Sequence, residues 1–247
     1  MLSIVQTISL MGLYGNLVEV QTDVNGGLPS FDIVGLPDTT VKESKERIKS
    51  AIKNSGVELT SKKILINLAP ADTKKEGSAY DLPIAVGILI AIDIIKKIDI
   101  KKTIFIGELA LDGKINKVTG VLPMCIEAKK LGIKNIIVPK ENEKEAAIVD
   151  GIDIISAETL EELIQYLNGN MKIPKTERKI ETIFEDINQN TIDFSEVKGQ
   201  ENVKRALEIA AAGRTQLSPN RKSAEQAKQC LHIEFQPFCQ TLHLTKH

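Results

Sequence analysis

Apolar and polar residues alternate along the beginning of the chain, which is the pattern of half-buried β-strands. The alternation runs from Leu2 to Leu10 and again from Leu17 to Val24, and Tyr14-Gly15-Asn16 lies between the two runs. This arrangement predicts a β-hairpin. Asn25-Gly26-Gly27 predicts the next turn, and Phe31 to Val34 predicts a third strand. We therefore expect the chain to start with three antiparallel strands.

The next segment has the period of an amphipathic helix. Val41, Ile48 and Ile52 lie on its inward side, and Gly56 is placed to end it. A glutamate three residues after Thr40 completes a capping box, so we expect the helix to begin there. The predicted outer face carries basic residues among glutamates: Lys42, Lys45, Arg47, Lys49 and Lys53.

The middle of the chain contains the most apolar segment. A strand-like run from Ile64 to Leu68 ends before Pro70, and a polar, charged loop follows. Leu82 to Ile95 is apolar almost all round, which is typical of a helix buried beneath a sheet. Thr103 to Ile106 then predicts a short interior strand, which ends at Gly107.

Strands and helices alternate after this point. We predict strands at 135–138 and 152–155, and helices at 119–131, 141–147 and 157–167. Cys125 lies on an apolar helix stripe, which indicates a buried thiol rather than a reactive one. The elements together predict an α+β, or mixed α/β, domain over residues 1–167. Residues 168–192 carry many charges and little periodicity, so we interpret them as a linker.

Composition limits the function classes. The net charge is −1, which excludes a globally basic protein but not a local basic patch. The sequence has no long uncharged apolar run and no basic-then-apolar leader, so we expect a soluble, cytoplasmic protein with no membrane partner. The three histidines are His232, His243 and His247, which excludes a Ser-His or Cys-His nucleophile from residues 1–231.

Three motifs in a fixed order carry a family resemblance. They are F-D-I-V-G-L-P-D from Phe31, K-K-E-G-S-A-Y-D-L-P-I-A-V-G-I-L from Lys74, and G-E-L-A-L-D-G-K-I from Gly107. Over residues 1–213 the chain resembles the magnesium-chelatase-like AAA+ proteins called YifB or ComM. The motif residues are Gly35, Leu36, Pro37, Asp38, Lys75, Glu76, Gly77, Asp81, Leu82, Pro83, Gly107, Glu108 and Gly113.

The resemblance implies an accessory domain that precedes an AAA+ ATPase module. Residues 193–213 are similar to the segment that opens that module. Intact members are expected to bind ATP and Mg, to form a hexameric ring with their own AAA+ module, and to act on DNA. The family's name also suggests metal insertion into a porphyrin, but that activity would require the ATPase site and partner subunits.

The same stretch is more distantly similar to the proteolytic domain of Lon. This resemblance implies a Lon-like fold, which is a sandwich of sheet and helices like ribosomal protein S5 domain 2. On the Lon pattern the nucleophilic serine falls on Ala79 and the lysine base near Leu122, so we expect no catalytic residue. The alternative is a serine-lysine peptidase that uses Ser78 with Lys74, Lys75 or a distant lysine.

Five lysines are candidate contacts for an anion or for DNA: Lys42, Lys45, Lys49, Lys74 and Lys75. For the first three we favour a solvated helix face, and a groove for nucleic-acid phosphates is the alternative. Lys74 and Lys75 precede a buried helix whose positive end would attract an anion. For Ser78 we favour a structural role, in which Gly77 forms the turn and Ser78 caps the helix. We interpret Glu108 as an acid in a turn.

Residues 214–247 differ in character from the rest of the chain. Back-translation of Ser223 to Leu231, read two bases later, permits G-G-A-G-K-T-M-L, which has the form of a Walker A loop. We therefore interpret the tail as frameshifted and disordered, and we expect no ATP, metal or other cofactor in this chain. Cys230, His232, Cys239 and His243 also have a spacing that zinc could use, which is the alternative for this segment.

Overall fold

The computed structural model describes residues 1–11, 14–59, 62–96, 100–176, 204–205 and 209. The chain divides into two compact units, Met1–Lys179 and Ile180–His247, and every element named below lies in the first unit. The tail that we interpret as frameshifted, its zinc alternative, residues 177–192 of the predicted linker and most of the predicted ATPase opening lie outside the described residues. No helix of the described residues is long and apolar enough to cross a membrane.

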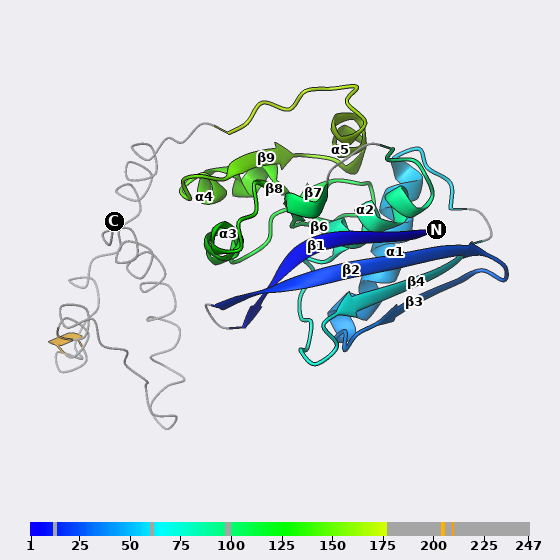
Figure 1. Ribbon diagram of the computed structural model, residues 1–247, viewed down its shortest axis with the longest axis horizontal. Helices are drawn as coiled ribbons and strands as arrows, with labels where there is room; N and C mark the ends of the chain where they lie inside the picture. Colours follow the sequence, from blue (N-terminus) through cyan, green and yellow to red (C-terminus); the bar gives the residue numbers. More distant parts are fainter. Residues whose placement is uncertain (12–13, 60–61, 97–99, 177–203, 206–208, 210–247) are drawn as a thin grey trace. The chain divides into compact units, whose positions relative to one another are not determined.

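A seven-stranded sheet forms the middle layer of the first unit (Figure 1). Its strands, in spatial order, are β3 (Ser30–Val34), β4 (Lys62–Ala69), β2 (Tyr14–Gly26), β1 (Leu2–Met11), β5 (Thr103–Phe105), β8 (Asn135–Pro139) and β9 (Asp153–Ala157). The pairs β1–β2 and β2–β4 are antiparallel and the other four pairs are parallel. A short hairpin of β6 (Glu108–Leu109) and β7 (Ile115–Asn116) lies apart from this sheet.

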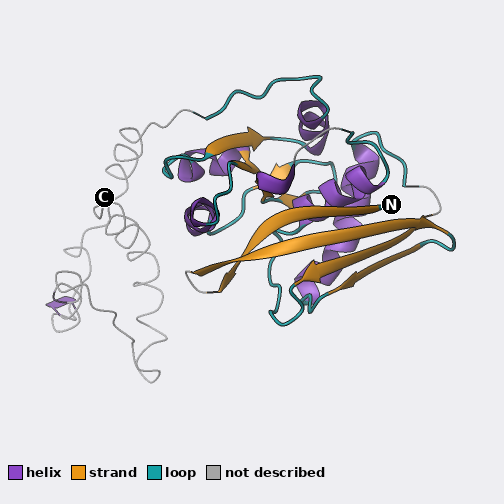
Figure 2. Cartoon of the chain, in the orientation of Figure 1, coloured by secondary structure: helices purple, strands orange, loops and turns teal. Residues whose placement is uncertain are grey.

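Helices cover both faces of the sheet (Figure 2). They are α1 (Thr39–Asn54), α2 (Asp81–Ala91), α3 (Val121–Lys130), α4 (Glu143–Ala146) and α5 (Leu160–Leu167), with short 3₁₀ turns η1 (Ile100–Lys102) and η2 (Lys140–Asn142). Neighbouring side chains of a strand point to opposite faces. Val5 of β1 packs in the core that contains α1, α2 and α5, whereas Ile8 packs in the core that contains α3 and α4. The fold is therefore a mixed α/β sandwich, as the sequence predicted.

Helix α2 is the centre of the larger core. Each residue from Asp81 to Leu89 is buried, which confirms the prediction of a buried central helix. The helix lies against β1, where the Ser3 hydroxyl donates a 2.7 Å hydrogen bond to the carbonyl oxygen of Gly87. It ends at Ala91, earlier than predicted, because Asp93 adopts a left-handed backbone conformation with φ of 69°.

The strand pairing differs from the predicted antiparallel start. Strand β3 pairs in parallel with β4, so the antiparallel strands are β1, β2 and β4. The predicted turn residues Gly15 and Asn16 belong to β2, where they pair with Leu10 and Ser9. The alternation pattern marks which residues are strands, but it contains no information on which strand pairs with which.

Two further helix details differ from prediction. Asp38, rather than a box starting at Thr40, caps α1, and its carboxylate accepts from the Val41 amide at 2.7 Å. The last helix begins at Leu160 with Thr159 as its cap, because the residues up to Ala157 extend β9. By contrast, the prediction that α1 ends near Gly56 is confirmed.

Residues 168–176, the first part of the predicted linker, are held on the first unit. The Asn168 side chain accepts from the Lys96 amide and donates to the carbonyl oxygen of Ile94. The Thr176 amide donates to the carbonyl oxygen of Ile154 at 3.0 Å. This part of the segment is therefore packed on the domain rather than extended away from it.

Candidate functional site

The three sequence motifs meet at the start of α2. The Leu82 amide donates to the carbonyl oxygen of Gly107 at 3.0 Å, and the Gly107 amide donates to that of Ala79 at 3.3 Å. Gly107 is required by this close packing, because a Cβ there would lie 2.8 Å from a methyl carbon of Ile115. The second and third motifs thus form one packed unit.

The first motif joins the same unit through the Gly35 to Asp38 turn. The Lys75 amide donates to the carbonyl oxygen of Leu36 at 3.1 Å, and the Asp38 amide donates to that of Lys75 at 2.9 Å. Gly35 has φ of 98°, and a Cβ at this position would collide with the carbonyl oxygen of Leu68. Only glycine fits this turn without strain.

Lys75 is fully buried, although the sequence suggested that it contacts an anion. Its ammonium donates to the carbonyl oxygens of Pro70 and Thr73, at 2.7 Å for Thr73. Burial lowers the pKa of Lys75, and nearby Asp72 opposes this only in part. The ammonium fastens the loop of residues 70–79 from inside, so Lys75 does not belong to an anion-binding surface. The loop fold brought the side chain inward, which local charge could not predict.

Arg47 and Asp81 form a buried ion pair that the sequence did not predict. The guanidinium donates two hydrogen bonds to the carboxylate, at 2.8 and 3.2 Å, and the Leu109 amide donates a third at 3.3 Å. Burial raises the pKa of Asp81 to about 6, although the hydrogen bond from Arg47 opposes the rise. Arg47 was predicted on the solvated face of α1; it instead links α1 to α2 and β6.

The serine-lysine pair of the peptidase alternative is not assembled in the described residues. The Lys74 ammonium pairs with Glu76 at 2.6 Å, and Lys75 donates to backbone carbonyls. Ser78 is not the helix cap that we predicted, because α2 starts at Asp81 and the Asp81 amide donates to the Ser78 backbone carbonyl. Neither loop lysine is arranged to take a proton from the Ser78 hydroxyl.

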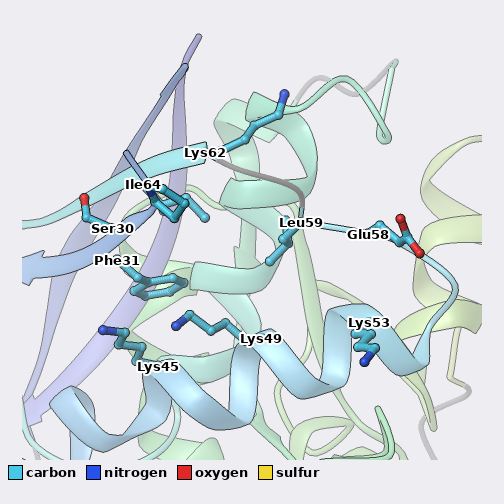
Figure 3. Close-up of a pocket in the computed structure, with 10 residues that line it drawn as sticks. Ser30, Phe31, Lys45, Lys49, Lys53, Glu58, Leu59, Lys62 and Ile64 are labelled. Carbon is cyan, nitrogen blue, oxygen red and sulfur yellow. The ribbon is translucent and has the colours of Figure 1, made fainter. Parts of the chain in front are cut away.

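A lysine-lined hollow of about 470 Å³ lies between α1, β3 and β4 (Figure 3). Its charged lining residues are Lys45, Lys49, Lys53, Lys62 and Glu58. Figure 3 shows Lys45 and Lys49 extending from α1 toward Phe31, with Lys62 across the hollow from them. The Lys49 ammonium lies 5.6 Å from the centroid of the Phe31 ring, within the range of a cation–π interaction.

The predicted cationic residues are only partly brought together in this lysine-lined hollow. Lys45 and Lys49 line it, whereas Lys42 and Lys74 are exposed elsewhere. Sequence reasoning did not select Lys53, although its i+4 spacing from Lys49 was a usable signal. Lys62 joins the hollow only through the pairing of β4 with β3.

Comparison with known proteins identifies the family. Residues 20–142 match the family model described as subunit ChlI of Mg-chelatase. The chain is 41% identical to competence protein ComM of Haemophilus influenzae over 217 residues, and 42% identical to protein YifB of Escherichia coli over 214 residues. The chain belongs to the magnesium-chelatase-like family of ComM and YifB.

The family match covers most of this chain but less than half of each relative. It includes 87% of this chain and 42% of ComM, and 86% of this chain and 41% of YifB. The chain thus spans about two-fifths of the length of these relatives. Lon protease 2 of Bacillus subtilis is 28% identical over 182 residues, covering 67% of this chain and 32% of that protein, in agreement with the mixed α/β fold.

The described residues contain no cluster of histidine, cysteine or acidic side chains that could hold a metal ion. Cys125 is buried in the smaller core, as the sequence predicted, and burial raises the pKa of its thiol to about 12. Glu108 lies in the β6–β7 hairpin and accepts from the Asn116 side chain at 3.4 Å. The motif residues described above, such as Gly35, Lys75 and Asp81, thus hold neighbouring helices, strands and loops together.

Proposed function

We propose that residues 1–176 form a non-proteolytic accessory domain of a magnesium-chelatase-like AAA+ ATPase. The observation that carries the proposal is the state of the loop of residues 70–79. In this loop Lys75 is buried against backbone carbonyls and Lys74 pairs with Glu76, so Ser78 lacks a base from either residue. Family membership supports the ATPase context.

We further propose that the intact protein binds and hydrolyses ATP with Mg, assembles as a hexameric ring through its AAA+ module, and acts on DNA. The name of the ComM relative refers to competence, which supports a role connected with DNA uptake. This chain contains no Walker A sequence, so we propose that it does not itself bind ATP. The accessory domain would orient the DNA or contact it while the ring moves.

A peptidase assay tests the non-proteolytic role. The 247-residue chain is incubated with unfolded casein, next to Ser78→Ala and a buffer blank. We expect equal background cleavage by both proteins. Cleavage by the original chain that disappears in Ser78→Ala would establish the serine-lysine peptidase instead.

Calorimetric titration with Mg-ATP tests the proposal that this chain does not bind ATP. We expect no heat of binding beyond the heat of dilution.

A further inference from the structure

We propose that the lysine-lined hollow binds a single strand of nucleic acid, with its lysines on successive phosphates and its apolar floor against the bases. The inference deepens the proposed function, and it rests on that function only for the choice of DNA over RNA. The hollow is distinct from the loop of residues 70–79, so the two sites can be tested separately.

The charge of the hollow is the first step. Among the described residues, no carboxylate forms an ion pair with Lys45, Lys53 or Lys62, and Lys49 has only Glu46, at 3.4 Å and exposed. Four lysines and a single glutamate therefore surround the opening, while the whole chain carries a net charge of −1. Unpaired ammonium groups gathered in one place attract a polyanion and release its counterions on binding.

The arrangement of the lysines indicates a linear ligand. Lys45, Lys49 and Lys53 follow one another at intervals of four residues on α1. At about 1.5 Å of rise per residue their row extends about 12 Å along the helix axis. A row of this length contacts several phosphates of a strand, whereas a lone phosphate would require the ammonium groups to converge on one point. Lys62 belongs to β4 and lies on the other side of the hollow from the row.

The floor of the hollow favours a single strand over a duplex. Phe31, Leu59 and Ile64 provide apolar lining between the charged groups. The bases of a single strand have exposed faces that pack on such surfaces, whereas a duplex keeps its bases stacked inside. Phe31 is 4% exposed and the Lys49 ammonium lies beside its ring, so a base that packs on Phe31 would have to displace the Lys49 side chain.

Fluorescence anisotropy with a labelled oligo-dT tests the inference. The hollow variant carries Lys45→Gln, Lys49→Gln and Lys53→Gln. The matched control carries Lys117→Gln, Lys129→Gln and Lys134→Gln, three exposed lysines outside the hollow. Circular dichroism and thermal unfolding first establish that both variants fold like the original chain.

We expect the hollow variant to bind at least tenfold more weakly at low salt, and the control to bind like the original chain. Each phosphate contact of a single strand contributes about 0.7 to the slope of log affinity against log salt concentration. Loss of three contacts should therefore reduce the magnitude of this slope by about two in the hollow variant. Equal losses in both variants would overturn the hollow as the site while leaving DNA binding intact. Equal competition by a duplex of the same length would overturn the single-strand preference.

Absence of oligo-dT binding by the original chain at low salt would overturn the inference and remove DNA contact from this domain. It would leave the non-proteolytic assignment standing, since the casein assay tests that assignment independently. A repeat with oligo-U distinguishes the source of the strand. Tighter binding of oligo-U than oligo-dT would assign the hollow to RNA and contradict the DNA role.

Discussion

Arg47 of α1 and Asp81 of α2 lie 34 residues apart in the sequence and form a two-pronged ion pair, with Nε 2.8 Å from one carboxylate oxygen. The Asp81 side chain is fully buried, whereas the Arg47 side chain is 26% exposed. The pair connects two helices of the larger core and, through the Leu109 amide, the β6–β7 hairpin. The second and third sequence motifs are therefore joined through one carboxylate, which also binds α1.

Removing the arginine should destabilise the fold at neutral pH. Arg47→Met keeps a long apolar side chain at this position but leaves the Asp81 carboxylate buried without its cation. We expect the free energy of unfolding at pH 7 to fall by about 3 kcal/mol, measured by urea denaturation. Glu46→Gln, on the exposed side of the same helix, is the control and should unfold like the original chain. A fall for Arg47→Met no larger than that of the control would show that the pair does not hold the helices.

Asp81 also makes stability depend on pH. Its folded pKa of about 6 lies above the unfolded value of about 3.9, so between these values the folded state retains a proton that the unfolded state has lost. The Asp81 contribution is therefore fully present below about pH 4 and is lost as pH rises through about 6.

Asp81→Asn isolates this effect, since asparagine does not titrate. Relative to the original chain, we expect the variant to gain about 2 to 3 kcal/mol in unfolding free energy between pH 4 and pH 7. Urea denaturation at each pH measures the difference, and subtraction removes the contributions of the other carboxylates. A relative loss over the same range would mean that Arg47 lowers the folded pKa of Asp81 below its unfolded value.

Gly35 should tolerate no side chain. Gly35→Ala places a Cβ against the carbonyl oxygen of Leu68 at a positive φ, and we expect a loss of about 2 kcal/mol or more in thermal or urea unfolding. Gly26→Ala is the matched control, because its Cβ would meet no atom within 4 Å. Equal effects of the two substitutions would contradict the described turn.

Lys75 should contribute to the stability of the fold and not to DNA binding. Lys75→Met keeps a long side chain but leaves the carbonyl oxygens of Pro70 and Thr73 without their donor. We expect the free energy of unfolding to fall by about 1 to 3 kcal/mol. Oligo-dT affinity should stay within twofold of the original. A clear loss of affinity with unchanged stability would return Lys75 to the binding surface.

The candidate site was predictable only where it follows one helix. Lys45 and Lys49 were selected from the basic face of α1, and their positions in the hollow agree with that pattern. Arg47 was assigned to the same face, but it turns inward because Asp81 provides a buried partner. Lys62 could not be selected, since it belongs to a strand, β4, and reaches the lysines of α1 only in the folded chain.

The sequence by itself determined the elements and their buried sides. The continuous apolar run identified α2 as a helix buried on all sides. The apolar period of α1 identified Val41, Ile48 and Ile52 as its inward positions. These are local properties, because the free energy of burying apolar surface acts at every turn of a helix and every second residue of a strand. Tertiary structure decided the parallel pairing of β3, the burial of Lys75 and the gathering of lysines around Phe31. Each of these depends on a partner that only the folded chain brings near, and a charged group lies inside or outside according to whether that partner is present.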